Sequence, residues 1–206
     1  IIEALISQAT IYEAPRYGIR WRMDSEFSNI RYYGRGPWEN YCDRKDGAMM
    51  SIYSCDVKDM YVPYVRPQEN GHRVDVQWLE ILNDKGKGLV IYAMSGKENS
   101  EKGDNYFEFN TLHNSVEDFD CEESDAPYQW NNFVENDPHD IGRARNVMMK
   151  QTHVSDISPR DFTEVCIDSR MTGVGGDNSW GAETYDKYKV LTSEPQRLVV
   201  KIVPVQ

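Results

Sequence analysis

The sequence predicts an all-β protein built as a large antiparallel sandwich. Two observations support this fold class. Apolar residues alternate with polar ones at a period of two, and turn-forming residues separate the alternating stretches at short intervals. Sheets that bury one face produce such alternation, and many short strands joined by turns are typical of sandwiches. We expect residues 1–206 to form one domain, since all-β domains of this length commonly form a single unit.

The clearest predicted strand covers residues 17–23. Tyr17, Ile19, Trp21 and Met23 fall on one face of an extended chain, while two arginines fall on the other face. A half-buried strand has this pattern, with its apolar face toward the core and its charged face toward solvent.

Further strands follow from weaker or more continuous patterns. Residues 89–94 form an apolar run of strand length, and the turn-forming stretch 83–88 before it predicts a hairpin. Residues 74–78 alternate as well, and the alternation changes phase at Leu79, which predicts a β-bulge. Four other segments are strand candidates, the last with the weakest pattern: 106–111, 162–167, 197–203 and 188–191.

Helix is scarce in the pattern. Ser115, followed three residues later by Asp118, predicts one short turn opened by a capping-box arrangement. Residues 121–150 contain two prolines, a glycine, asparagine-rich clusters and several acids, so we expect a long, irregular surface loop there.

Charge and composition exclude several classes of partner. The chain has 23 Lys and Arg against 34 Asp and Glu, a formal net charge of −11. Binding of nucleic acid rests mainly on a basic surface, so nucleic acid is excluded as a partner. Anionic membranes are disfavoured for the same reason, and no apolar run approaches the roughly 20 residues needed to span a bilayer.

The compartment is left open between cytoplasm and periplasm, with the cytoplasm favoured. Residues 1–10 lack the basic region and the longer apolar core of a signal peptide. They also lack an initiator methionine, so we expect the chain to be a piece of a longer protein. The four cysteines show no zinc-site spacing and are expected to be free thiols, although spacing alone leaves a disulfide open: Cys42, Cys55, Cys121 and Cys166.

A search for catalytic residues finds no convincing set. The acidic residues fit a solvated face, and the four histidines lie far apart without metal-ligand spacing, so no metal site is expected in this chain. One alternative stays open, a mutarotase-like acid–base pair made by His72 or His113 with Glu80 or Glu108.

Two segments have the composition of functional or tightly built loops. The first is residues 32–44, in which glycines and Pro37 permit tight turns. Four of its charged residues are expected to form a lattice of charge-assisted hydrogen bonds: Arg35, Glu39, Asp43 and Arg44.

The second segment, residues 173–180, places one large aromatic residue after three glycines and a polar run. Trp180 could stack on the apolar face of a sugar ring, while Asp177 and Asn178 bond to hydroxyl groups and Ser179 supports the loop. The alternative, a structural tryptophan that closes the sandwich, stays open on these grounds.

In order along the chain, from about residue 14 to residue 190, these segments resemble the C-terminal domain of the large β-galactosidases of glycoside hydrolase family two. Several long motifs in the right order are far more specific than any one of them. The matching segments are 15–18, 33–37, 39–41, 43–44, 61–71, 75–79 and 173–181.

The resemblance implies a supersandwich of the galactose-mutarotase type, with the first strands of the domain absent from this chain. It also implies a parent enzyme that hydrolyses terminal β-galactosides such as lactose. In that family the two catalytic glutamates lie on a separate barrel domain, where Mg and Na ions are implied as well. We therefore expect no catalytic residue and no cofactor in this chain, and no activity from the chain alone.

Residue by residue, the resemblance implies that Trp180 offers a platform to the aglycone sugar and that residues 177–179 support it. Segments 33–44 and 61–71 are given structural roles. Cys42 stands where the family usually has proline, and Trp38 where glutamine is common.

The partners implied by the resemblance are a galactoside or lactose aglycone and the remaining domains or large subunit, in an oligomeric parent. Two alternative functions are a stand-alone carbohydrate-binding module and a mutarotase-like aldose epimerase.

Overall fold

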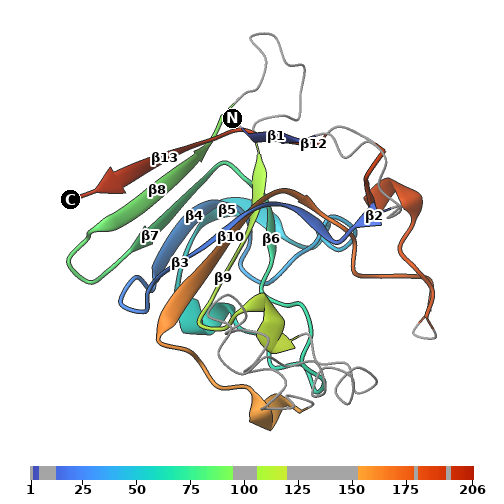
Figure 1. Ribbon diagram of the computed structural model, residues 1–206, viewed down its shortest axis with the longest axis horizontal. Helices are drawn as coiled ribbons and strands as arrows, with labels where there is room; N and C mark the ends of the chain where they lie inside the picture. The colour runs from blue at the N-terminus through green and yellow to red at the C-terminus, as the bar shows by residue number, and fades with distance from the viewer. Residues whose placement is uncertain (1, 5–12, 95–105, 120–152, 179–180, 194–195) are drawn as a thin grey trace, which may run out of the picture.

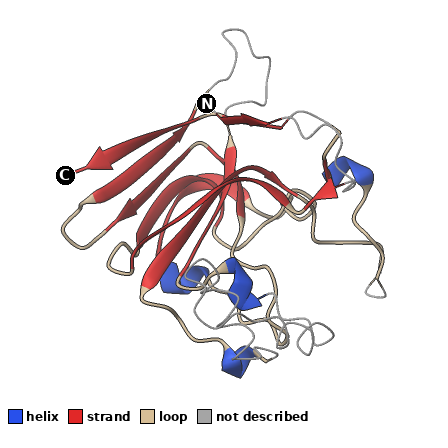
Figure 2. Ribbon diagram, viewed as in Figure 1, coloured by secondary structure: helices blue, strands red, loops and turns tan. Residues whose placement is uncertain are grey.

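Antiparallel strands make up nearly all of the regular structure in the computed structural model, which confirms the predicted all-β class (Figure 2). The structure describes residues 2–4, 13–94, 106–119, 153–178, 181–193 and 196–206. Among these residues no helix is long and apolar enough to cross a membrane. The helical elements there are short 3-10 turns: η1 (Val57–Met60), η2 (Val116–Phe119), η3 (Val154–Asp156) and η4 (Asp186–Tyr188).

The larger sheet has five strands in the spatial order β13-β8-β7-β4-β5 (Figure 1). Every neighbouring pair is antiparallel, and the predicted hairpin is confirmed as β7 and β8, with Leu82 opposite Gly88. The strands are β4 (Asn29–Gly36), β5 (Met49–Asp56), β7 (Trp78–Leu82), β8 (Gly88–Ala93) and β13 (Val200–Val205).

The second sheet has four antiparallel strands in the order β3-β10-β9-β6. They are β3 (Arg16–Asp24), β6 (Arg73–Val76), β9 (Phe107–Leu112) and β10 (Phe162–Met171). Two small pairs complete the described strands: β1 (Ile2–Ala4) with β12 (Gln196–Leu198), and β2 (Glu13–Ala14) with β11 (Val190–Leu191).

One hydrophobic core lies between the two larger sheets. The Tyr32 ring of β4 meets the Phe109 ring of β9 edge to face, with centroids 5.1 Å apart. The predicted apolar face of β3 packs against this core, as period-two alternation requires. Buried apolar side chains come from both sheets: Ile30, Tyr32, Leu79, Ile81 and Ile91 from the larger, and Val76, Phe107, Phe109, Val165 and Ile167 from the smaller.

The phase change at Leu79 has a different cause from the predicted bulge. β6 ends at Val76 in the four-stranded sheet, and β7 begins at Trp78 in the five-stranded sheet. The chain therefore changes sheet at Gln77, which reverses the side-chain alternation. The irregular register of β6 lies earlier, between Arg73 and Val76.

The prediction of a loop over residues 32–44 is wrong for its first part, because residues 32–36 belong to β4. Gly34 and Gly36 occupy buried positions of this strand rather than turns. A Cβ on Gly34 would lie 2.7 Å from Val76 Cγ2, and one on Gly36 would overlap the Tyr32 hydroxyl. The glycines are needed because neighbouring groups already fill the space that side chains would take.

Other differences concern strands that depend on pairing more than on pattern. β5 was not predicted, because it lies at the sheet edge and its exposed and half-buried residues do not alternate cleanly. β10 extends to Met171, residues 197–203 divide between β12 and β13, and 188–191 shrinks to β11.

The short turn after Ser115 is confirmed, since the Ser115 amide donates to Asp118 Oδ2 over 2.9 Å. The loop predicted at 121–150 lies outside the described residues.

Candidate functional site

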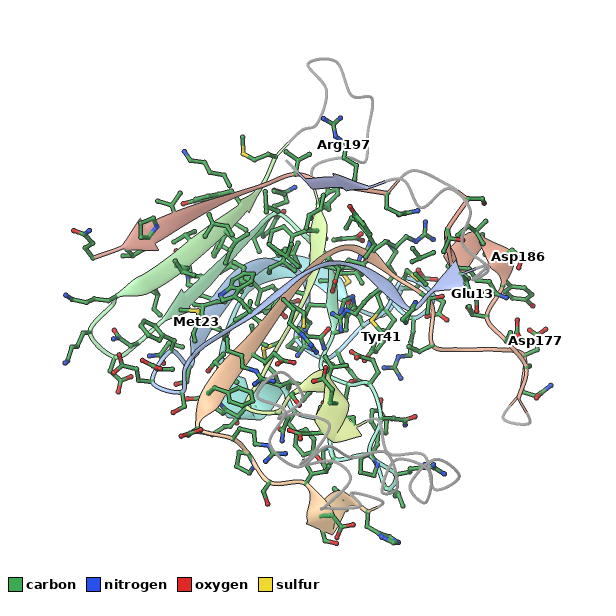
Figure 3. The ribbon with its side chains drawn as sticks, in the orientation of Figure 1. Glu13, Met23, Tyr41, Asp177, Asp186 and Arg197 are labelled. Atoms are coloured by element: carbon green, nitrogen blue, oxygen red, sulfur yellow. The ribbon has the colours of Figure 1, made fainter. Side chains whose placement is uncertain are left out.

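The glycine-rich segment predicted to face a sugar follows β10 and extends away from the two sheets (Figure 3). Asp177 lies on its outer part, where it is exposed. The base of the segment is closed by a hydrogen bond from the Gly173 amide to the Tyr188 carbonyl, at 2.8 Å. The Cys42 thiol lies beside this base, 3.5 Å from the Met171 carbonyl.

Asp43 joins the two arms of this segment from outside. Its Oδ2 accepts a hydrogen bond from the Gly175 amide at 2.7 Å and another from the Thr184 hydroxyl at 3.2 Å. Asp43 comes from residues 37–48, between β4 and β5, so the contact links parts of the chain more than 130 residues apart. We use the name "loop 172–185" for the segment that Asp43 holds.

Two of the three glycines are required by these close approaches. A Cβ on Gly173 would lie 2.5 Å from Asp43 Oδ2, and one on Gly176 would overlap the Ala182 carbonyl oxygen across the loop. Within the described residues, these glycines make room for Asp43 and for the opposite arm of their own loop.

The outer part of loop 172–185 is braced from within. The Tyr185 hydroxyl donates to Asp177 Oδ1 over 2.6 Å, between residues that are both exposed. Asp177 thus supports the loop, and Asn178 next to it is also exposed. Ser179 and Trp180 lie outside the described residues, so the predicted sugar platform stays a prediction.

The segment that carries Asp43 is tied to β6 by buried polar groups. Arg73, 4% exposed, donates to the Pro37 carbonyl at 2.8 Å and to the Tyr32 hydroxyl at 3.1 Å. Asn40, also buried, accepts from the Val74 amide at 3.0 Å. Buried polar groups whose partners are all in place give a rigid local structure, and Asp43 follows three residues after Asn40.

The predicted charge lattice of residues 35–44 divides into three separate arrangements. Glu39 pairs with Arg44, as expected. Arg35 instead donates to Asp75 of β6, and Asp43 binds loop 172–185. Sequence spacing indicated charge-assisted bonding, but it could not assign partners that the chain brings from elsewhere.

A cleft of about 370 Å³ opens beside residues 36–48. Asp43 and Trp38 both line it, and Trp38 is 79% exposed. Sequence reasoning noted Trp38 only as a departure from the family pattern. The structure shows that this departure places a large exposed aromatic ring close to the residue that holds loop 172–185.

A buried polar cluster beside Met171 is formed by β9 and by the residues just before β6. His72, wholly buried, lies 2.9 Å from Glu108 Oε2 and 2.6 Å from Asn110 Oδ1. Asn110 uses its amide nitrogen to donate to Glu69 and to the Asn70 carbonyl, so its oxygen faces His72. Both imidazole nitrogens therefore face acceptors.

This arrangement favours a protonated His72. Burial opposes the charged ring, but the hydrogen bond and the charge of Glu108 outweigh that effect and raise the His72 pKa above its usual value. Glu108 Oε2 also accepts from the Met171 amide at 2.7 Å, which connects the cluster to the residue before loop 172–185.

The structure therefore brings together one of the pairs named for an epimerase, His72 with Glu108. His72 has 0% exposure and both of its ring nitrogens have hydrogen-bond partners, so within the described part of the chain this pair is sealed from solvent. His113 lies just after β9, whereas Glu80 belongs to β7 of the other sheet and bonds to Arg31.

Cysteine and metal chemistry add no site within the described residues. Cys42, Cys55 and Cys166 are free thiols there, and Cys121 lies outside that part of the chain. Burial raises the pKa of Cys42 to about 11 and that of Cys166 to about 12, which keeps both protonated at neutral pH. The same residues hold no group of three or more His, Cys, Asp or Glu suited to a metal ion.

Comparison with known proteins identifies the family. A family model described as beta galactosidase small chain matches residues 2–202. A β-galactosidase of Priestia megaterium is 32% identical over 91% of this chain, and one of Streptococcus thermophilus is 27% identical over 92%. Beta-galactosidase BgaC of Bifidobacterium adolescentis is 28% identical over 91%.

The aligned part is small in each relative. The chain spans 14–15% of the length of these three proteins, so it corresponds to a small part of each of them. The match covers β3 to β12 completely, including Asp43 and loop 172–185. The chain belongs to the beta galactosidase small chain family.

Proposed function

We propose that this chain is the part of a β-galactosidase that completes the mouth of the active site. The whole enzyme would hydrolyse terminal β-D-galactosides such as lactose. Loop 172–185 would present Trp180 as a stacking surface for the aglycone sugar, supported by residues 177–179. The observation that carries this proposal is the bracing of an extended, glycine-rich loop by Asp43 and by the contact of Asp177 with Tyr185.

A braced loop suits this role for a physical reason. An aromatic side chain stabilises a bound sugar more when its position is held before binding, because ordering it during binding offsets part of the gain. The two arms of loop 172–185 are held at Gly175 and Thr184 by one carboxylate oxygen. The close approach of Gly176 to the Ala182 carbonyl, which the missing side chain permits, keeps the described parts of the two arms together.

The catalytic groups are proposed to lie on other domains or on a large subunit of the same enzyme, in an oligomeric assembly. We place the Mg and Na ions expected for the family with the catalytic glutamates, outside this chain. No step of the reaction is assigned to a residue of this chain.

The proposal is tested by Trp180→Ala in the full enzyme, with lactose and a small aryl galactoside compared as substrates. An aromatic contact contributes about 0.5–1.5 kcal/mol, so kcat/KM for lactose should fall roughly 2- to 12-fold more than kcat/KM for the aryl galactoside. Trp38→Ala is the matched control, because it removes another exposed tryptophan and should leave the ratio of the two substrates unchanged. Equal losses on both substrates in Trp180→Ala would show that Trp180 is only structural.

A second measurement separates this function from the alternatives. The purified chain alone should not hydrolyse galactosides, and turnover by a preparation free of host galactosidase would contradict the proposal. Tight binding of galactosides by the isolated chain would instead favour a stand-alone carbohydrate-binding module. Anomer interconversion lost on replacing His72 or His113 would favour an epimerase.

A further inference from the structure

We propose that Asp43 is a positioning residue for Trp180: it fixes loop 172–185 and thereby sets how well the enzyme handles a sugar aglycone. The inference rests on the proposed function, since it concerns the same sugar platform. Asp43 touches neither substrate nor catalytic group in this scheme. It acts through the loop, by holding Gly175 on one arm and Thr184 on the other.

Asp43 comes from another part of the chain and contacts both arms of the loop. Gly175 and Thr184 lie on either side of residues 176–183, and both donate to the same atom, Asp43 Oδ2. One acceptor thus brings the two arms together at a single point. Gly173 passes so close to that oxygen that any larger residue would displace it.

The support behind Asp43 is rigid enough to transmit its position. Asn40 and Arg73 tie the preceding residues to β6 through buried hydrogen bonds. Tyr41 and Arg44, on either side of Asp43, exchange backbone hydrogen bonds at 2.8 and 3.2 Å, which closes a tight turn around it. The carboxylate therefore projects from a fixed turn, and the loop is held relative to the sandwich core.

The hydrogen bonds use one oxygen of the carboxylate. Asp43 Oδ1 is buried and has no hydrogen-bond partner among the described residues. An amide oxygen can accept both bonds in place of Oδ2, so the inference predicts that Asp43→Asn keeps the loop in place. Asp43→Ala removes the acceptor altogether and leaves the exposed Gly175 amide to solvent.

The experiment measures loop anchoring and substrate preference in the same full-length enzyme. Hydrogen exchange is followed by mass spectrometry for peptides covering residues 172–178. The ratio of kcat/KM for lactose to that for an aryl galactoside is measured in parallel. The variants are Asp43→Ala and Asp43→Asn, with Asp46→Ala as the matched control, because Asp46 is an exposed carboxylate of the same segment.

In Asp43→Ala, exchange in this segment should rise about tenfold, and the lactose-to-aryl ratio should fall in the same direction as in Trp180→Ala. Asp43→Asn and Asp46→Ala should retain both properties of the wild type. Unchanged exchange in Asp43→Ala would overturn the inference, as would faster exchange with an unchanged substrate ratio. An Asp43→Asn variant as impaired as Asp43→Ala would also overturn it.

Thr184→Val provides a milder test in case Asp43→Ala fails to fold. It keeps the shape of the side chain and removes one of the two donors to Asp43 Oδ2. Hydrogen exchange should therefore rise and the lactose-to-aryl ratio should fall, both by less than in Asp43→Ala. Wild-type exchange and substrate ratio in this variant would count against the inference. Failure of the proposed function is distinguishable from failure of this inference. In that case the lactose-to-aryl ratio of kcat/KM would be unaltered in Trp180→Ala as well as in Asp43→Ala.

Discussion

Gly34 of β4 lies too close to Val76 of β6 to leave room for a side chain, and Gly34→Ala tests that contact. The new Cβ would lie 2.7 Å from Val76 Cγ2 and 3.1 Å from Val76 Cα. Carbon atoms in good contact are about 3.5–4.0 Å apart, so the first distance is too short by nearly 1 Å. The valine terminus can rotate away, whereas its Cα can move only with β6.

The expected net cost is about 2 kcal/mol. Overpacking a core typically costs about 1–3 kcal/mol, and replacing a strand glycine with alanine recovers roughly 0.5–1 kcal/mol of backbone entropy. The backbone contact with Val76 Cα places Gly34→Ala in the upper part of the range. Val76→Ala alone removes two buried methyl groups and should cost about 2 kcal/mol.

The assay is urea unfolding of the 206-residue chain, followed by tryptophan fluorescence and far-UV circular dichroism. The double variant Gly34→Ala/Val76→Ala should be destabilised by at least about 1 kcal/mol less than the sum of the single variants, because each relieves the other. Gly47→Ala is the control, since no atom lies within 4 Å of its added Cβ. If Gly34→Ala cost no more than Gly47→Ala, or if the two single costs were additive, the packing argument would be refuted.

Two pH-dependent predictions follow from buried charges. The His72 pKa is raised in the folded state, so the stability from its protonated form is complete below its ordinary pKa of 6.5 and is lost as pH rises through the folded value. The unfolding free energy should fall above pH 6.5 with a slope of at most about 1.4 kcal/mol per pH unit for one proton, and His72→Gln should flatten this fall. An unchanged pH profile would contradict a protonated His72 in the folded state. For Asp75, burial favours a higher pKa, but Arg35 and Lys45 hold the pKa below its ordinary value of 3.8. The contribution of the ionised carboxylate to folding stability is therefore present above pH 3.8 and is lost on acidification through the lower folded pKa. Asparagine tolerates the positive φ of 56° at this position. Asp75→Asn should therefore lessen the loss of stability between pH 5 and pH 3, and equal acid sensitivity in the variant and the wild type would count against the ion pair.

Local pattern was sufficient for strands whose apolar and polar residues alternate cleanly. Tyr17, Ile19, Trp21 and Met23 were assigned to the buried face of β3 by alternation alone, and they pack there. The hairpin of β7 and β8 followed from the turn residues between them, because register in a hairpin is set by its turn. These features depend on neighbours in the chain, which the sequence displays directly.

Local pattern failed where a distant segment supplies the reason. Gly34 and Gly36 suggested turns, yet they lie within β4 because Val76 and Tyr32 fill the space above them. The alternation around Gln77 suggested a bulge, yet the chain changes sheets there. Both features reflect which strands pack together, and periodicity carries no information on that choice.

The features of the candidate site also separate into those that the sequence predicts and those that depend on the tertiary structure. The sequence by itself determined the all-β class, the family and the glycine-rich loop that leads to Trp180, because these follow from composition, alternation and ordered motifs. Only the tertiary structure decided that Asp43 holds this loop and that His72 is sealed against Glu108. A hydrogen bond between residues 132 positions apart depends on how the sheets bring two segments together, and no local spacing encodes it.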